Sequence, residues 1–194
     1  MKILETYNGK ELPKVETERL ILRQRTLEDA EDIFAYASLP EICWPAGFPP
    51  VKTVEDERYY LETVYPQNLI DNKIPSGYGI TRKGQDKVIG SIDFNHRHAA
   101  DVLEIGYALH TDYWGQGIVP EAAAALIELG FTLLNLHKIE IHCYDDNKQS
   151  QRVAEKLGFT LEARIRDRKD VQGNRCDGLI YGLLRSEWES LSNV

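Results

Sequence analysis

The sequence lacks a long apolar run and a close pair of cysteines, and each absence excludes a class of protein. No stretch approaches the length of a membrane-spanning helix, and Glu5 precedes any apolar run of signal-peptide length. Cys43, Cys143 and Cys176 are far apart and form no C-x-x-C pair, so neither a zinc motif nor a redox dithiol is indicated. We therefore expect a cytoplasmic protein with buried free thiols and no membrane contact.

Acidic residues outnumber basic ones, with 31 Asp and Glu against 23 Lys and Arg, and this excess bears on the partners of the protein. The net charge of −8 at pH 7 opposes phosphate backbones, so we expect no nucleic-acid partner and favour an amine-bearing substrate. The 194 residues are 42% hydrophobic and 28% charged, as in an ordinary globular protein. No shift in composition marks a boundary, and we expect a single domain over residues 1–194, as a monomer or homodimer.

The hydrophobic pattern predicts an α+β (mixed α/β) fold, with a mixed sheet of about seven strands flanked by helices. Three consecutive strands are separated by short polar turns at 83–86 and 96–101, and such links imply antiparallel neighbours. Capping boxes at Thr26 with Asp29 and at Thr53 with Asp56 introduce two early helices. The expected strands are 18–25, 77–82, 87–95, 102–110, 138–144, 160–168 and 178–184; the later helices are 120–134 and 148–157, and 39–50 is a loop.

The most informative segment runs from the strand at 102–110 through a glycine loop into the helix that follows. Gly115 and Gly117 allow a tight turn and a close approach to a ligand, while the start of the helix directs unpaired N–H groups outward. A pyrophosphate fits such a concavity. No G-K-S/T follows, which excludes a P-loop, and Pro120 stands where a dinucleotide fingerprint requires its third glycine.

This segment resembles the acetyl-CoA signature of GNAT-type N-acetyltransferases, usually written R/Q-x-x-G-x-G/A. Here it reads Trp114, Gly115, Gln116, Gly117, Ile118, Val119, and the run Asn147, Ser150, Val153, Lys156, Leu157, Gly158, Phe159 resembles the family's next motif. The residues Leu183, Leu184, Arg185, Glu187 and Trp188 are similar to the end of the RimJ/RimL-like branch, which acts on ribosomal proteins. About residues 16–188 follow the family in element order.

The resemblance implies a GNAT-like, mostly antiparallel sheet with one splayed parallel pair, and acetyl-CoA as cosubstrate without a metal. The splayed strand end would pair with the pantetheine arm, and Asn147 would close that arm from the other side. Arg152 would either meet a phosphate or be solvated. Trp114 and Val119 depart from the signature, and Val119 could crowd the phosphates unless it packs on the helix. The implied cofactor residues are Tyr107, Ala108, Leu109, Trp114, Gly115, Gln116, Gly117, Ile118, Val119, Asn147 and Arg152.

Two residues are predicted to be catalytic in direct attack of an amine on acetyl-CoA. Glu104 lies between Leu103 and Ile105 in a central strand and would accept the proton, while the N–H near Leu109 would polarise the carbonyl. Many relatives place a tyrosine acid at the position of Ala154, so Ser150 is the candidate that protonates the thiolate. The alternatives are a surface glutamate and a helix-surface serine.

Other polar and aromatic residues carry weaker indications. His96, His98 and His110 suggest a metal site only if further ligands join them, and their isolation in the sequence leads us to expect none. Trp44 and Phe48 would either wall the acceptor pocket, as that region does in the family, or cap the core.

The acceptor is left open by the sequence. The RimJ/RimL-like resemblance favours a protein N-terminal α-amine, and the alternatives are a small-molecule amine such as an antibiotic, polyamine or amino acid. Two further hypotheses are a catalytically silent acyl-CoA-binding module and a small dinucleotide-dependent enzyme, for which Asp145 and Asp146 at a strand end are the only support.

Overall fold

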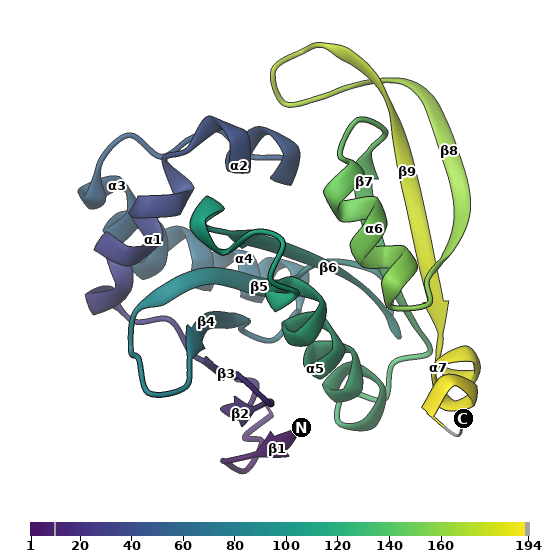
Figure 1. The fold of residues 1–194 in the computed structure, drawn as a ribbon, viewed down its shortest axis with the longest axis horizontal. Coiled ribbons are helices and arrows are strands. Elements are labelled where there is room, and N and C mark those ends of the chain that lie inside the picture. The colour runs from purple at the N-terminus through teal and green to yellow at the C-terminus, as the bar shows by residue number, and fades with distance from the viewer. Residues whose placement is uncertain (10, 193–194) are drawn as a thin grey trace.

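An open, nine-stranded sheet is the centre of the fold in the computed structural model, which describes residues 1–9 and 11–192. The strand order is β1-β2-β3-β4-β5-β6-β7-β9-β8, and the pair β6 and β7 is parallel while the other neighbours are antiparallel (Figure 1). The strands are β1 Lys2–Ile3, β2 Val15–Glu16, β3 Leu20–Arg23, β4 Tyr78–Arg82, β5 Val88–Ala99, β6 Val102–Leu109, β7 Lys138–Tyr144, β8 Thr160–Lys169 and β9 Arg175–Leu184.

The predicted fold class is confirmed, with two differences in the strands. The sheet has nine strands where about seven were expected, because β1 and β2 contain two residues each and are too short to show an alternating pattern. The segment 96–101, expected as a turn, mostly extends β5 as far as Ala99. The backbone of this extension pairs with β6 through a bulged register. This extension brings His98 beside β6.

Helices occupy the expected segments and two others, 40–46 and 185–192, and the second early helix continues as far as Asn72. The loop predicted at 39–50 is wrong, because Pro40–Ala46 forms α2. Pro40 stands at the first position of this helix, where its missing N–H costs little, and Gly47 ends the helix at φ 87°. None of the described helices has the length and apolar character that crossing a membrane requires. The α-helices are α1 Ala30–Ala37, α2 Pro40–Ala46, α3 Val54–Tyr59, α4 Tyr65–Asn72, α5 Ile118–Thr132, α6 Lys148–Lys156 and α7 Arg185–Ser192; 3-10 turns span Leu27–Asp29 and Thr111–Tyr113, and a π-helical turn spans Tyr60–Val64.

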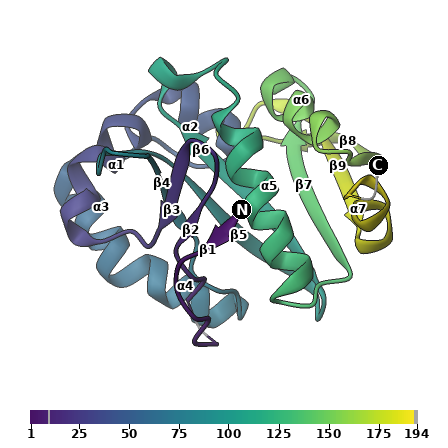
Figure 2. The same ribbon diagram turned by 60° about the horizontal axis from the view of Figure 1, so that its bottom comes forward.

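The two faces of the sheet carry separate apolar cores. Helix α5 packs its Ala-rich surface on one face, against residues such as Ile80, Phe94 and Leu103 (Figure 2). On the other face the side chains of α1 and α2 pack near Val88 and Ala108. Because side chains alternate along a strand, even-numbered residues of β6 face α1 and α2, whereas its buried odd-numbered residues face α5.

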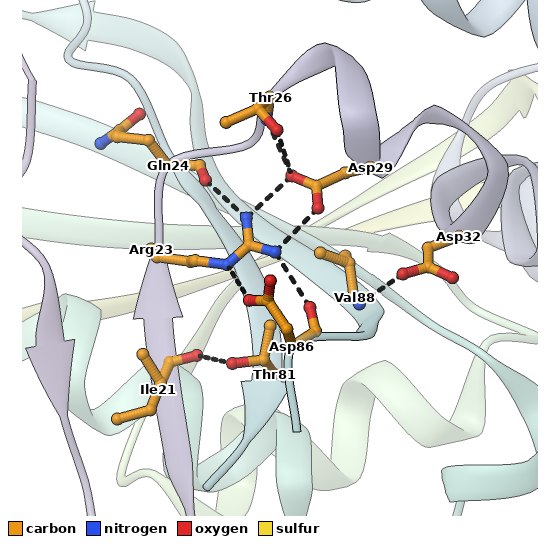
Figure 3. Close-up of polar contacts among 9 residues, drawn as sticks. All are labelled: Ile21, Arg23, Gln24, Thr26, Asp29, Asp32, Thr81, Asp86 and Val88. Carbon is orange, nitrogen blue, oxygen red and sulfur yellow. Dashed lines mark hydrogen bonds and ion pairs between the residues drawn. The ribbon is translucent and has the colours of Figure 1, made fainter. Parts of the chain in front are cut away.

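A partly buried arginine, Arg23, joins β3 to the first helix and to the turn between β4 and β5 (Figure 3). The Arg23 guanidinium makes a bidentate contact with Asp29, at 2.8 and 2.7 Å, and also donates to the backbone oxygens of Gln24 and Asp86 and to the Asp86 carboxylate. The Thr26 N–H donates to Asp29, which confirms the predicted capping box. This network holds α1 against the sheet.

Candidate active site

A cavity of about 500 Å³ lies where β6, β7, α2 and the starts of α5 and α6 meet. Its wall includes the end of β6, the glycine loop, and part of α6. Such a concave, mixed polar and apolar site is the expected form of a cofactor and substrate pocket. The residues that line the cavity include Glu41, Pro45, Glu104, Tyr107, Ala108, Leu109, Trp114, Gly115, Gly117, Ile118, Val119, His142, Asn147, Ser150, Arg152 and Lys156.

The glycine loop presents backbone donors to this cavity. Gly115 and Gly117 both have φ 73°, a left-handed conformation that disfavours any side chain. Gly117 is the N-cap of α5, and among the described residues no side chain caps that helix start, so the first N–H groups of α5, at Ile118 and Val119 on the cavity wall, are available to a ligand. Val119 packs partly on the core formed with α5. The loop therefore has the form of an anion-binding helix terminus.

Charged side chains brace this loop from the side of β3. Arg19 donates to the Gln116 carbonyl at 2.9 Å and pairs with Glu121 at 2.6 Å. Burial alone would raise the pKa of Glu121, but hydrogen bonds from Thr17 and Arg19 outweigh it and lower the pKa. Arg82 also bonds the Gln116 side chain. The loop is thus held in place before any ligand binds.

Strands β6 and β7 separate toward their C-terminal ends (Figure 1). Their register covers residues 102–104 of β6 and ends at the pair Glu104 and Glu140. The His110 N–H donates to Ile89 of β5, and because amides alternate along a strand, the Leu109 N–H points into the opening on the β7 side. The edge of β6 from Ile105 to Leu109 that faces β7 therefore has backbone groups that no strand pairs with in residues 1–9 and 11–192.

Two side chains frame the opening. Trp114 donates its indole N–H to the Leu109 carbonyl at 2.8 Å and so fixes the end of β6. Asn147 caps α6 by accepting from the Ser150 N–H, and donates to the Pro45 carbonyl of α2 at 3.1 Å. Asn147 therefore lies across the cavity from β6 and ties α6 to α2.

Glu104 is the acidic centre of the cavity and is 9% exposed. It lies on the face of the sheet that α2 covers, and its Oε2 is 2.9 Å from His98 Nε2 and 3.3 Å from His142 Nδ1. The two imidazole rings stack with centroids 4.9 Å apart. The buried position excludes the surface-glutamate alternative, and the pair of histidines was not expected.

A second carboxylate, that of Glu140 on β7, contacts His142. Glu140 Oε2 is 2.8 Å from His142 Nε2, and Glu140 Oε1 is 2.8 Å from Lys138 Nζ. Burial acts to raise the pKa of Glu140, but hydrogen bonds from Lys138 and His142 more than compensate and lower it. Glu140 is thus a stable anion behind His142.

A pair of hydroxyl groups lies on the opposite side of the opening. Tyr107 Oη is 2.7 Å from Ser150 Oγ, which joins β6 to α6. Burial raises the pKa of Tyr107, and the hydrogen bond with Ser150 only partly offsets it. Ser150 is 6% exposed, so it is not a helix-surface serine. The phenol stays protonated and can support a proton on Ser150.

Comparisons with known proteins agree with this geometry. The family model described as acetyltransferase (GNAT) domain matches residues 19–160, more than half of the chain. This protein belongs to the GNAT acetyltransferase family.

Among relatives of this GNAT acetyltransferase, the uncharacterized N-acetyltransferase p20 of Bacillus licheniformis is 34% identical over 173 residues, covering 89% of this chain and 96% of that protein. Shorter matches are the ribosomal-protein-serine acetyltransferase of Escherichia coli, 39% identical over 83 residues (42% of this chain, 46% of that protein), and its spermidine N(1)-acetyltransferase, 30% over 74 residues (38% and 39%). A GNAT-family acetyltransferase from Bacillus anthracis superposes with a TM-score of 0.78 at 26% identity, over 90% of this chain and 99% of that one.

The GNAT assignment makes the chain an acetyl-CoA-dependent N-acetyltransferase and decides against the dinucleotide-dependent alternative. The structure gathers the predicted site residues around one cavity, although Ala108, Leu109 and Ile118 are largely buried and Gln116 is not among the lining residues. Arg152 is exposed and lines the cavity wall, and within the described residues its side chain has no hydrogen-bond or ion-pair partner. Their roles stay predictions.

Several residues of the GNAT site were missed or misjudged from the sequence. His98 is not isolated, because β7 brings His142 to it, and this contact depends on register across three strands. Lys156 follows Arg152 by four residues and lines the same wall, a spacing that could have been read from the sequence. Phe48 packs against the core near α1, and neither it nor Trp44 lines the cavity; Glu41 and Pro45 of α2 do so instead.

Proposed function

We propose that this acetyltransferase moves the acetyl group of acetyl-CoA directly to the N-terminal α-amine of a protein. The observation that carries the proposal is the arrangement around the opening between β6 and β7. Glu104 lies on one side, the Tyr107 and Ser150 hydroxyls lie on the other, and the Leu109 N–H points between them. An amine and a thioester that meet in this opening have a base and an acid on opposite sides.

Each group in the opening has one step. Glu104 accepts the proton of the attacking ammonium, directly or through water, which leaves a neutral amine. The Leu109 N–H stabilises the negative charge that develops on the carbonyl oxygen. Ser150, bonded to Tyr107, donates a proton to the departing thiolate and is reprotonated by the second proton that the attacking nitrogen loses as the amide forms. The acetyl carbon thus loses its bond to sulfur as it gains one to nitrogen, and the transfer itself requires no metal.

The cofactor is proposed to lie along the part of the cavity wall that the glycine loop, the end of β6 and α6 form. Its diphosphate accepts hydrogen bonds from the loop at Gly115 to Val119, where the helix terminus favours negative charge. Its pantetheine arm takes the unused backbone edge at Tyr107, Ala108 and Leu109, with Asn147 on the other side. Arg152 and Lys156 supply positive charge to a phosphate.

Three arguments favour an α-amine over a polyamine. A free α-amine has a pKa of about 7.7–8.0, well below the value of about 10.4 for an alkyl ammonium group, so one carboxylate can deprotonate it near neutral pH. The cavity wall has two carboxylates, Glu41 and Glu104, which is few for a chain of several cationic centres. The E. coli ribosomal-protein-serine acetyltransferase also matches at higher identity than the spermidine enzyme.

The test is acetyl transfer to a matched set of acceptors. A short peptide with a free N-terminus, the same peptide with a blocked N-terminus, and spermidine are each incubated with acetyl-CoA, and the free thiol is measured. We expect turnover with the free peptide and none with the blocked one. Preference for spermidine would overturn the acceptor class. Titration calorimetry with coenzyme A, showing no binding, would overturn the cofactor site.

A further inference from the structure

Side chains from three adjacent strands meet at the base of the cavity. His98 comes from β5, Glu104 from β6 and His142 from β7, and one ligand atom from each lies within 4.8 Å of the others. We propose that these three residues bind one first-row divalent transition cation, with Zn²⁺ as the model ion, and that the bound ion inhibits acetyl transfer.

The spacing of the three side chains suits such an ion. Tetrahedral Zn²⁺ binds nitrogen and carboxylate oxygen at about 2.1 Å, which separates neighbouring ligand atoms by about 3.4 Å. Glu104 Oε2 is 2.9 Å from His98 Nε2 and 3.3 Å from His142 Nδ1. The imidazole rings of His98 and His142, which stack at an interplanar angle of 20°, have to rotate about χ2 so that both lone pairs converge on the ion.

The contacts of His142 with two carboxylates are the second observation. Its Nε2 faces Glu140 at 2.8 Å and its Nδ1 faces Glu104 at 3.3 Å, so both ring nitrogens meet carboxylate oxygens. A neutral imidazole has one N–H and one lone pair. A cation between Nδ1 and the Glu104 oxygen would take the lone pair of Nδ1 while the N–H on Nε2 stays on Glu140, so that both contacts of the ring would be favourable.

Glu140 also resembles the supporting carboxylate of a metal site. Histidines that bind metals commonly donate their second ring N–H to a carboxylate, which fixes the ring and raises its basicity. Glu140 holds His142 in this way and is itself held by Lys138 at 2.8 Å. The support for a ligand histidine is therefore already built into β7.

The ligand types select the class of ion. Two imidazoles and one carboxylate match the donor set of zinc and related ions, whereas Mg²⁺ and Ca²⁺ prefer oxygen alone. The His98 side chain is 38% exposed, which gives an ion access from solvent. Glu104 and His142 also line the cavity, so the fourth position of the ion would open toward the acceptor.

Inhibition follows from a shared carboxylate, and this part rests on the proposed function. A Glu104 carboxylate bound to a cation cannot accept the proton of the amine. The ion would also stand where the ammonium group is expected to approach. Binding of the ion and acetyl transfer should therefore exclude each other.

The binding test uses the full-length, untagged protein after treatment with a chelator and its removal. Titration calorimetry with ZnCl₂ is expected to show one ion per chain, and His98→Ala and His142→Ala should each abolish this binding. Glu140→Gln leaves the ligands intact and should weaken binding about 10-fold to 100-fold. His137→Ala is the control, since His137 is exposed on the segment before β7 and outside the cluster.

The outcomes separate the site from the proposed function. Absence of stoichiometric binding to the parent protein, or unchanged binding in both ligand variants with normal thermal melting, overturns the site. If the ion binds, ZnCl₂ should stop turnover with the best acceptor, and a chelator should restore it. Turnover that is unaffected at saturating ZnCl₂ overturns the inhibition. The cofactor site is tested independently by coenzyme A binding in the chelator-treated protein.

Discussion

Two clusters of ionisable side chains, one around Arg23 and one around Glu104, show how a structural network differs from a reactive one. The guanidinium of Arg23 has five N–H donors and makes five hydrogen bonds, to Asp29, Asp86 and Gln24 (Figure 3). Glu104 instead faces two imidazoles and a cavity, and its contacts depend on where protons lie. A completed network holds the fold, whereas an incomplete one beside a cavity can exchange protons.

The largest effect that sharpens this contrast is expected for Glu104→Gln. The substitution keeps the shape of the side chain and removes the proton acceptor, so kcat should fall about 10²-fold to 10⁴-fold. Coenzyme A affinity and the free energy of unfolding should change little, because the loop and both cores are untouched. Steady-state kinetics, calorimetry and urea denaturation measure the three quantities. A normal kcat would remove Glu104 from the mechanism.

The opposite behaviour is expected for Asp29→Ala. The change leaves the largely buried Arg23 guanidinium without its bidentate partner and removes a capping box, which should lower the free energy of unfolding by about 3 kcal/mol. Turnover per folded molecule should be nearly unchanged. Urea denaturation and kinetics below the transition measure both. A large fall in kcat with little loss of stability would erase the distinction between the two clusters.

Asp29 also makes the free energy of unfolding depend on pH, with a definite sign. Burial acts to raise the pKa of Asp29, but hydrogen bonds from Arg23 and Thr26 outweigh it, and the folded pKa lies below the ordinary value. Its stabilising contribution is therefore present at neutral pH and is lost as the pH falls below about 3.9 and through the lower folded value. Asp29→Ala should be less sensitive to acid than the parent protein over that range.

A smaller effect distinguishes the two hydroxyl groups across the opening. If Ser150 protonates the thiolate and Tyr107 supports it, Ser150→Ala should lower kcat by about 10-fold to 100-fold, and Tyr107→Phe by less. Both variants should keep their stability within about 1 kcal/mol, because each loses one hydrogen bond. A larger loss for Tyr107→Phe would make the phenol the direct acid. Losses in the free energy of unfolding that match the losses in kcat would mean that Ser150 and Tyr107 have a structural role.

The local patterns of the chain predict its elements better than its site. Alternation of Ile139, Ile141 and Cys143 predicts β7 with its observed bounds, and the capping box at Thr26 is local chemistry that neighbouring residues decide. The glycine loop can also be predicted locally, because the left-handed conformation of a residue before a helix depends on the residue type at that position and not on distant contacts. These features could be found before any tertiary contact was known.

The cluster around Glu104 could not be predicted in this way. It depends on β5 continuing through a bulge to His98 and on the parallel register that sets Glu104 beside Glu140. Polar alternation in 96–101 indicates a turn as readily as an exposed strand. The contact between Asn147 and Pro45 depends in the same way on α2, whose two prolines indicate a loop. Residues far apart in the sequence decide both arrangements.

The smallest expected effect compares two glycines, one in the glycine loop of the cavity and one in the turn that contributes Asp86 to the Arg23 network. Gly117 in the loop and Gly84 in the turn before Asp86 have φ of 73° and 78°, and no atom closer than 3.5 Å meets an added Cβ at either position. Alanine at each should therefore cost about 1–2 kcal/mol of backbone strain. Only Gly117→Ala should also weaken coenzyme A binding, by about 10-fold, since relief of the strain turns the amides away from the diphosphate. Equal affinity in both variants, measured by calorimetry, would place the diphosphate elsewhere, because the backbone direction at Gly117 would then not matter to it.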